Sequence, residues 1–300
     1  MTNLAILMDI HGNLMALEAI IRDLEAQMPE AELDGVVLCG DTISVGPYSK
    51  EVLALVLARD WALIRGNHEY YLLDHDTDRC PPDRKKDLPP FLAKTLNGYW
   101  RNQIAMLPDT LSLQFADAPA IRVYHSTKRS PFDTIYPHMN EHEIEIRFGG
   151  TVEQTILHGH NHLQYERQVA GWHLINAGSA GLPLDGIRKA CYAILRSHPG
   201  GWEPEFRRVD FDLEPILEGF KAQKFQEATG HFGILIIEEF KQARTFIAPF
   251  SRWFDQTYGN RKPTLDEVKY FIDHDEIRWQ YTYPPFLINL PDAYAHLKPV

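Results

Sequence analysis

Residues 3–13 read NLAILMDIHGN, an apolar run followed by Asp9 and His11, two side chains of the kinds that bind metal ions. The run from Leu4 to Met8 is typical of a buried strand. Asp9 and His11 follow it two residues apart, a spacing that in extended chain points both side chains to the same side. The next residues place apolar side chains three and four positions apart, as on one face of a helix. This strand, loop and helix are typical of an α/β fold.

The same arrangement recurs through the first half of the chain. Further strands are predicted over 35–39, 62–65, 120–124, 155–158 and 172–176. The polar side chains that follow them are Asp41 after the second strand, Asn67 and His68 after the third, His125 after the fourth, and His160 and His162 after the fifth. In an open α/β sheet the carboxyl ends of strands gather along one edge, so we expect these side chains to converge. Any one of them alone would suit a turn, a helix cap or an ordinary buried histidine.

The charge of the chain restricts its partners. The 300 residues include 30 Lys and Arg against 41 Asp and Glu, which gives 30 − 41 = −11, and 44% of them are hydrophobic. This composition excludes intrinsic disorder and gives no general attraction to nucleic acid or to an anionic membrane. A phosphate-bearing partner must therefore meet a local positive charge such as a metal ion.

The cysteines and the start of the chain indicate a cytoplasmic protein. Cys39, Cys80 and Cys191 are odd in number and widely spaced, which argues against a disulfide framework and a thiolate zinc site. The first residues lack a basic leader, and the longest apolar run, Val52 to Ala58, is too short to cross a membrane.

The chain is predicted to change character after Asp210, with a catalytic domain over 1–210 and a helical extension over 211–300. One apolar helical stripe runs from Phe232 to Ile247, and a later helix begins at Thr264, which forms a T-x-x-E capping box with Glu267. These stripes could cover a sheet edge, meet a second copy in a homo-oligomer, or lean over the metal crevice. A charged, proline-rich segment over 74–97, which becomes helical over about 91–106, predicts an insertion or lid.

The ordered motifs resemble those of one family, the calcineurin-like metallophosphoesterases. The matching elements are Asp9-Ile10-His11, Gly40-Asp41, Gly66-Asn67-His68-Glu69, His125 and Gly159-His160-Asn161-His162. The stretches DIHGNLMALEAI and INAGSAGLP are similar to the small bacterial and archaeal phosphodiesterase branch. The resemblance covers about residues 1 to 210 and implies an α/β/β/α sandwich, here with an additional C-terminal helical segment.

The resemblance also implies a role for each matching residue. Asp9, His11 and His162 would bind one metal ion, Asn67, His125 and His160 the other, and Asp41 would bridge the two. The expected cofactors are two divalent or mixed-valence transition metal ions, with Mn, Fe, Zn or Ni suited to these oxygen and imidazole donors. A hydroxide shared by both ions would attack a phosphodiester or phosphomonoester, and His68 would protonate the leaving group.

Several neighbouring residues have open assignments. Glu69 could orient His68, or it could be a solvated or helix-N-terminal carboxylate. Lys128, Arg129 and Arg65 could contact substrate phosphate or be ordinary surface charges.

One departure from the family pattern indicates which branch of the family the chain resembles. Val45 stands where the protein-phosphatase and diadenosine tetraphosphatase branches carry an arginine before the glycine, which favours the phosphodiesterase type.

A non-catalytic scaffold with this fold is the alternative function, but the presence of His68 favours the enzyme. A nuclease is disfavoured because no basic stripe is present. The expected partner is a small phosphorylated or nucleotide-like substrate, with no long nucleic acid and no membrane.

Overall fold

Two five-stranded sheets form the centre of the protein. The structure is a computed structural model and describes residues 1–80, 88–259 and 261–282. The strands are β1 (Asn3–Leu7), β2 (Gly35–Leu38), β3 (Ala62–Leu63), β9 (Ala190–His198) and β10 (Gly201–Val209) in the first sheet, and β4 (Thr110–Leu113), β5 (Ile121–Tyr124), β6 (Thr155–Leu157), β7 (Gln164–Val169) and β8 (Trp172–Ala177) in the second. Their orders are β10-β9-β1-β2-β3 and β4-β5-β6-β8-β7.

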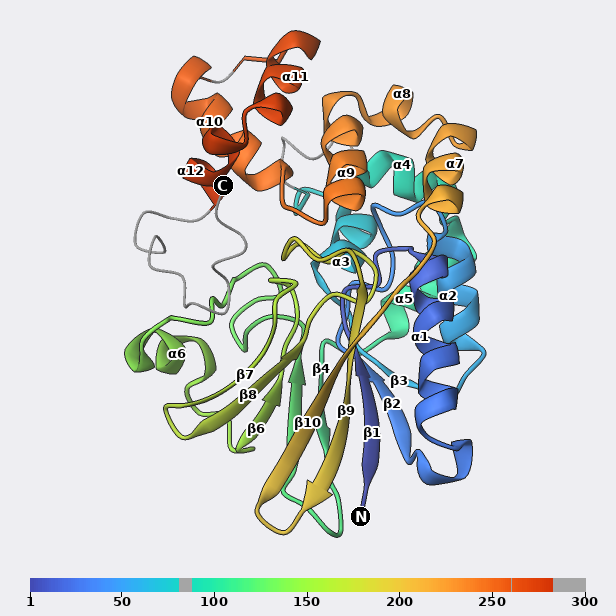
Figure 1. The fold of residues 1–300 in the computed structure, drawn as a ribbon, viewed down its shortest axis with the longest axis vertical. Helices are drawn as coiled ribbons and strands as arrows, with labels where there is room; N and C mark the ends of the chain where they lie inside the picture. Colours follow the sequence, from blue (N-terminus) through green and yellow to red (C-terminus); the bar gives the residue numbers. More distant parts are fainter. Residues whose placement is uncertain (81–87, 260, 283–300) are drawn as a thin grey trace.

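Each sheet combines parallel and antiparallel strand pairs. In the first sheet β1, β2 and β3 run parallel, while β9 pairs antiparallel with the other side of β1, so that Ala5 lies opposite both Val36 and Ile194. In the second sheet β5, β6 and β8 run parallel. The carboxyl ends of β1, β2 and β3, and those of β5 and β6, lie at the same end of the molecule, the upper end in Figure 1.

The side chains of β1 alternate between two hydrophobic clusters. Leu4 and Ile6 join the cluster between the sheets, which includes Val123 of β5, whereas Ala5 and Leu7 join the cluster under the helices. Successive side chains of a strand point to opposite faces, so a strand buried on both faces must be apolar throughout. This is why the run NLAIL can lie at the centre of the fold.

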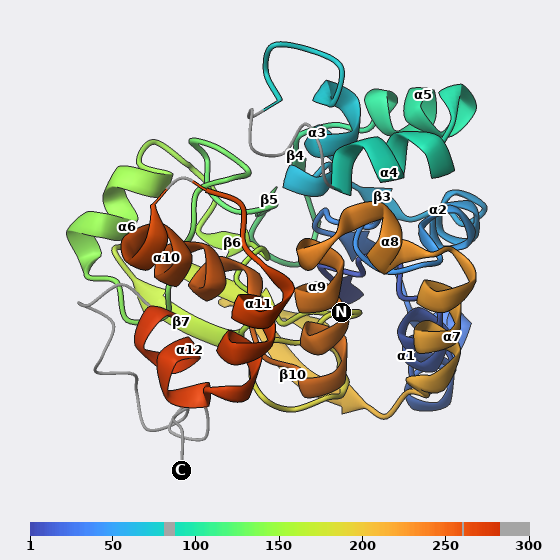
Figure 2. The ribbon, with the colours of Figure 1, turned by 90° about the horizontal axis from the view of Figure 1, so that it is seen from above.

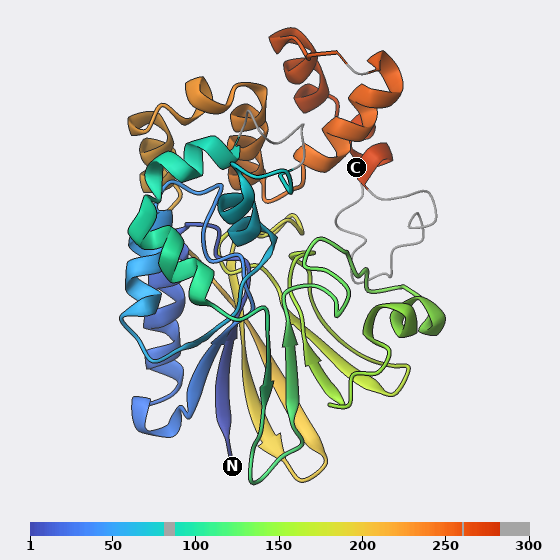
Figure 3. The same cartoon turned by 180° about the vertical axis from the view of Figure 1, so that it is seen from behind.

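Helices cover the outer face of each sheet. They are α1 (Leu14–Gln27), α2 (Ser49–Leu57), α3 (Asn67–Asp74), α4 (Leu88–Thr95), α5 (Gly98–Met106), α6 (Glu141–Phe148), α7 (Glu214–Ala222), α8 (Phe225–Thr229), α9 (His231–Gln242), α10 (Ile247–Tyr258), α11 (Leu265–Asp273) and α12 (Asp275–Thr282), with a short 3₁₀ turn at Glu30–Glu32. In Figure 1, α1 and α2 flank the first sheet and α6 flanks the second, an arrangement also visible from behind in Figure 3. The predicted α/β/β/α sandwich with C-terminal helices is confirmed.

The C-terminal helices lie above the carboxyl ends of the strands, as the view from above in Figure 2 shows. Ile216 and Phe220 of α7 and Ile236 of α9 belong to the same hydrophobic cluster as Leu7. The helices α10, α11 and α12 form a further cluster with Leu235, in which Phe250 is buried. The division into two domains at residue 210 stays a prediction.

Two predicted helical runs are interrupted. The stripe from Phe232 to Ile247 is divided between α9 and α10, because Ala243 has a φ of 52° and ends α9 in the left-handed conformation. The run over 91–106 is divided between α4 and α5. Residues 81–87 of the predicted insertion lie outside the described residues, as does the end of the chain after Thr282. No helix in the described ranges is both long and apolar enough to span a bilayer.

A buried carboxyl group holds the corner between α9 and α10. Glu239 Oε1 accepts hydrogen bonds from the backbone N–H groups of Phe246 at 2.7 Å and Ile247 at 2.9 Å. Burial raises the pKa of Glu239 to about 7, although these N–H groups, Thr245 and the Arg278 guanidinium favour the ionised form. The folded protein therefore retains this proton at a pH where the unfolded chain has lost it.

We expect Glu239→Gln to change how stability depends on pH. For a carboxyl group with a raised pKa, folding loses stability as the pH rises from the unfolded value of 4.5 through about 7. Glutamine does not titrate. The free energy of unfolding of the variant, relative to that of the wild type, should therefore increase by on the order of 2 kcal/mol between pH 5 and pH 8. Urea unfolding at several pH values measures the difference. Glu238→Gln, which removes a carboxylate bonded to Lys241 and Gln242, is the control for loss of charge. A Glu239→Gln difference that is the same at pH 5 and pH 8 would contradict this expectation.

Candidate metal centre

The loops after β1, β2, β3, β5 and β6 bring the predicted ligands together. Ligand atoms of Asp9, His11 and His162 lie within 4.8 Å of one another, and so do those of Asp41, His125 and His160. Asp9, His11, Asp41, Asn67, His125 and His162 are buried, and His160 is partly buried. The loops come from two sheets packed face to face, rather than from the single sheet edge that the sequence pattern predicts, because β5 and β6 belong to the second sheet.

Asn67 completes the second group. Its Oδ1 lies 2.8 Å from His125 Nε2 and 2.9 Å from His160 Nδ1. In the first group, His11 Nε2 lies 3.1 Å from His162 Nε2. The two groups meet at Asp41, whose Oδ2 lies 3.4 Å from His125 Nε2 and 3.7 Å from His11 Nε2. The geometry thus places one carboxylate between two clusters of donor atoms.

Backbone carbonyl groups fix the orientation of two imidazoles. His125 Nδ1 lies 2.9 Å from the Cys39 carbonyl oxygen, and His162 Nδ1 lies 2.5 Å from that of Leu182. A carbonyl oxygen can only accept, so each Nδ1 must carry the proton and, in the neutral ring, Nε2 presents its lone pair to the centre. Lone pairs and carboxylate oxygens that face one another in a buried space suit bound cations, and the donor set of oxygen and imidazole fits transition metals.

Glycines allow the ligand loops to approach one another. A Cβ atom at Gly66 would collide with Asp41 Oδ1, and one at Gly159 would lie 2.8 Å from Asp9 Oδ2. The glycine directly before Asn67 and the glycine directly before His160 are therefore required by the neighbouring ligand. This explains why the G-N-H and G-H-x-H motifs begin with glycine.

Several of the predicted ligands have a positive backbone φ angle. Asp9 has a φ of 52°, His11 50°, Asp41 52°, His160 69° and His162 60°. The expectation that Asp9 and His11 converge because the chain is extended is therefore wrong, as is the same expectation for His160 and His162. They converge through left-handed backbone, which costs about 1 to 3 kcal/mol per residue outside glycine and is typical of functional sites.

The buried carboxylates and imidazoles shift one another's pKa values. Burial raises the pKa of Asp9 to about 6, and His162 and His125 only partly oppose this. Burial also disfavours the charged form of Asp41, but His125, His68 and His11 outweigh it and hold its pKa well below the ordinary value. Burial lowers the pKa of His125, yet Asp41 and Asp9 outweigh it and raise that pKa to about 9. Without cations, the proton on His125 balances part of the carboxylate charge, and bound metal would take over that role.

Comparison with known proteins agrees with this geometry. Residues 2–199 match the calcineurin-like phosphoesterase superfamily domain. The chain belongs to this superfamily. The domain contains every predicted ligand, and the helices α7 to α12 follow it in the chain.

Similar proteins are found in archaea and bacteria. The Methanocaldococcus jannaschii protein MJ0912 is 25% identical over 254 residues, which cover 76% of this chain and 95% of MJ0912. A metallophosphoesterase from Sphaerobacter thermophilus has a similar structure, with a TM-score of 0.63 and 19% identity over 81% of this chain and 99% of that one. The protein PH1004 from Pyrococcus horikoshii OT3 has a TM-score of 0.69 and 19% identity over 82% and 100% of the two chains. At this identity the two structures show a shared fold.

His68 stands at the mouth of the metal centre of the phosphoesterase domain. Its side chain is partly exposed, its backbone N–H donates to Asp41 Oδ1 at 2.9 Å, and its Nδ1 lies 2.5 Å from Ser44 Oγ. His68 Nε2 lies 4.0 Å from Asp41 Oδ2, and with His11 and Asp41 it forms a third group of potential ligands. Two roles are thus geometrically available to His68, proton donor and metal ligand. Nothing in the sequence pattern indicates the contact with Ser44.

Glu69 is a structural residue of the phosphoesterase domain that sequence reasoning did not place. It is fully buried, and it accepts hydrogen bonds from the backbone N–H groups of Asp41 at 3.0 Å, Thr42 at 2.9 Å and Gly66 at 2.7 Å. It is therefore a buried carboxylate at a helix N-terminus, one of the roles that the sequence leaves open for it, and not a solvated carboxylate. Its hydrogen bonds join the Asp41 loop to the start of α3. The three-residue spacing of Gly66 and Glu69, as in a capping box, is the signal that could have found it.

The basic residues considered as phosphate ligands lie in a separate hollow. Arg65, Lys128 and Arg129 line a space of about 210 Å³ next to His125. Arg65 pairs with Asp109 at 2.6 Å, and Lys128 donates to the Gly149 carbonyl oxygen at 2.8 Å. Two of the three are thus already engaged within the protein.

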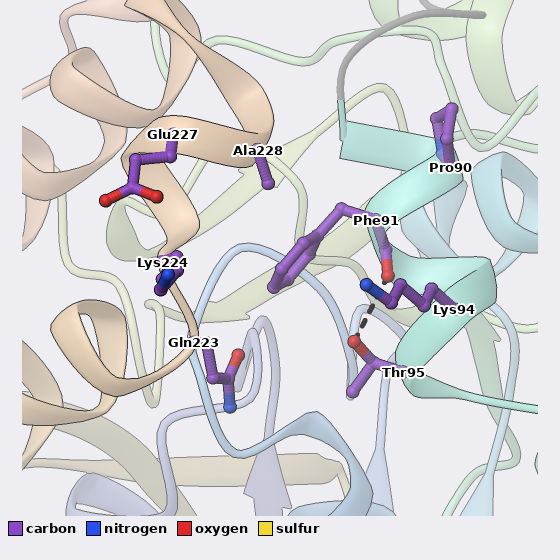
Figure 4. Close-up of a pocket in the computed structure, with 8 residues that line it drawn as sticks. All are labelled: Pro90, Phe91, Lys94, Thr95, Gln223, Lys224, Glu227 and Ala228. Carbon is purple, nitrogen blue, oxygen red and sulfur yellow. Dashed lines mark hydrogen bonds between the residues drawn. The ribbon is translucent and has the colours of Figure 1, made fainter.

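A larger hollow, of about 720 Å³, lies between α4 and α8. Figure 4 shows Phe91, Lys94 and Thr95 on one side and Gln223, Lys224, Glu227 and Ala228 on the other. None of the predicted metal ligands lines it. Size alone therefore does not locate the chemistry, which is concentrated where the donor atoms converge.

Proposed function

We propose that the protein is a binuclear metal-dependent phosphoesterase that hydrolyses phosphodiester or phosphomonoester bonds. The position of Asp41 between two clusters of donor atoms carries this proposal. The proposed ligands are Asp9, His11, Asp41, Asn67, His125, His160 and His162, and the proposed ions are two of Mn, Fe, Zn or Ni. We further propose a cytoplasmic enzyme that acts on a small phosphorylated or nucleotide-like substrate.

The metal ions and the protein side chains would have different roles in the reaction. Two cations held at this centre would supply an activated water as nucleophile and neutralise the phosphoryl oxygens. Asp41 keeps the two ligand clusters at a fixed separation, and Glu69 holds the loop that carries Asp41. His68, partly exposed at the mouth of the centre and hydrogen-bonded to Ser44, donates a proton to the departing oxygen.

Metal analysis followed by a hydrolysis panel tests the proposal. We expect two ions per chain after loading with Mn²⁺ and removal of excess metal. The loaded protein should hydrolyse p-nitrophenyl phosphate or bis-p-nitrophenyl phosphate, and chelator should abolish the activity, because each step depends on the cations. One ion or none would contradict the binuclear centre. Two ions without hydrolysis of any phosphoester would instead favour the non-catalytic scaffold.

A further inference from the structure

The C-terminal helices form one wall of the crevice at the metal centre. A hollow of about 230 Å³ is lined on one side by His11, Asn67, His68 and the two histidines of the G-H-x-H motif. On the other side it is lined by residues of α9, the corner and α10, namely Phe232, Glu239, Thr245, Ile247 and Ala248. A substrate that reaches the ligands through this hollow would therefore place another part against these helices.

The chemistry of this wall is apolar. Phe232 and Ile247 line it, and Leu182 and Leu184, which precede the C-terminal helices in the chain, continue the apolar lining. Glu239 Oε1 accepts hydrogen bonds at the corner between α9 and α10. No Lys or Arg occurs among the described residues that line this hollow. A second phosphate group would meet no Lys or Arg among these described residues, whereas an uncharged apolar group would bury its surface against them.

The size of the crevice also favours a compact substrate. Its volume of about 230 Å³ includes the space beside the metal ligands. Pockets for drug-sized molecules usually measure roughly 300 to 1,000 Å³. The space beyond the phosphoryl group is therefore smaller than the usual pocket for a drug-sized molecule, which favours a compact arm.

We infer that the wall selects phosphoesters with one phosphoryl group and a compact, uncharged alkyl or aryl arm over nucleotides and polyphosphates. This inference rests on the proposed function, because it assumes that the phosphoryl group meets the metal ligands. The specificity-determining residues are Phe232, Ile247 and Ala248. Glu239 is a positioning residue, since it acts through the backbone of Phe246 and Ile247.

Non-hydrolysable phosphonates test the inference by binding. Calorimetry on the metal-loaded protein should show that phenylphosphonate binds at least about tenfold more tightly than methylphosphonate, since the ring buries several further carbon atoms. The phosphonate analogue of adenosine monophosphate, in which a CH₂ group replaces the ester oxygen, should bind no more tightly than methylphosphonate. Equal affinities for phenylphosphonate and methylphosphonate, or a preference for the nucleotide analogue, would overturn the inference.

Two matched substitutions locate the effect. Ala248, near the start of α10, and Ala228, in α8, are both exposed, and each lines a different hollow. Ala248→Trp should weaken phenylphosphonate binding by about tenfold and leave methylphosphonate binding unchanged within about twofold. Ala228→Trp, in the hollow of Figure 4, should change neither. If Ala228→Trp weakens phenylphosphonate binding and Ala248→Trp does not, the arm is bound elsewhere and the inference is wrong.

The hydrolysis panel separates this inference from the proposed function. Hydrolysis of aryl and nucleotide esters with similar kcat/KM would contradict the selective wall and leave the phosphoesterase standing. Preferential binding of phenylphosphonate by a metal-loaded protein that hydrolyses no phosphoester would support the wall and contradict the enzyme.

Discussion

Asp41→Ala should lower kcat/KM for p-nitrophenyl phosphate by about 100-fold or more and reduce the metal content of the protein. Asp41 lies between the two ligand clusters, so its removal affects both proposed ion sites at once. The two-metal clamp stabilises the transition state by several kcal/mol, and each 1.4 kcal/mol corresponds to about a factor of ten. Elemental analysis and steady-state kinetics measure the two effects.

Asp9→Asn is the comparison variant for the bridging role. Asp9 belongs to the cluster with His11 and His162 but not to the cluster with His125. Asparagine retains an oxygen donor, so we expect a smaller loss, about tenfold. Asp41→Asn, similar in shape to the wild type, controls for disruption of the loop. Equal losses in Asp9→Asn and Asp41→Asn would count against a bridging Asp41.

His68→Ala should keep the metal content near that of the wild type and lower kcat. General acid catalysis contributes about 10² to 10⁴, and its share grows with the pKa of the leaving group. We therefore expect a loss of about 100-fold or more on alkyl esters and about tenfold or less on p-nitrophenyl esters. A plot of log kcat against leaving-group pKa should be steeper for the variant than for the wild type.

Two further variants give this prediction its controls. Ser44→Ala removes the oxygen that lies 2.5 Å from His68 Nδ1 and should produce a smaller loss of the same kind, because the ring remains but is less well oriented. His173→Ala removes a histidine paired with Glu166 and should change neither metal content nor kcat. If His68→Ala loses an ion, then His68 is a ligand and the assignment as acid is wrong.

The part of the fold that follows from the sequence is the part with the simplest patterns. The strand before Asp9 and the strands before Asp41 and His125 are short, apolar and followed by ligands, so their type and their direction can be predicted together. The capping box of Thr264 and Glu267 is also confirmed at the start of α11. In each case a local interaction determines the local structure.

The remaining strands depend on contacts that are distant in sequence. β4, β7, β9 and β10 are absent from the predicted elements. β10 carries Glu203, Pro204 and Glu205, which disfavour a strand when read locally. In the fold it is an edge strand, and Glu205 pairs with Arg196 of β9 at 2.7 Å. The tertiary pairing outweighs the local preference.

The candidate site likewise combines features that can be predicted from the sequence with features that cannot. The ligand types and their order can be read from the chain, but the positive φ angles of Asp9 and Asp41 and the role of Glu69 cannot. Left-handed backbone at a non-glycine residue is imposed by surrounding hydrogen bonds, such as that from Asp9 N to the Gly40 carbonyl oxygen at 3.2 Å. Glu69 likewise acts on backbone groups 26 to 28 residues away.

The position of β1 between β2 and β9 has a consequence for synthesis of the chain on the ribosome. One edge of β1 can pair as soon as residues 35–38 emerge, but the partner for its other edge begins at Ala190. At about 5 to 20 residues per second, this interval lasts roughly 8 to 30 s. During that time an apolar strand presents unpaired N–H and C=O groups, the condition that favours association with other nascent chains. A chaperone that shields the emerging N-terminal half would act on this edge, and the need for it would end when β9 is added.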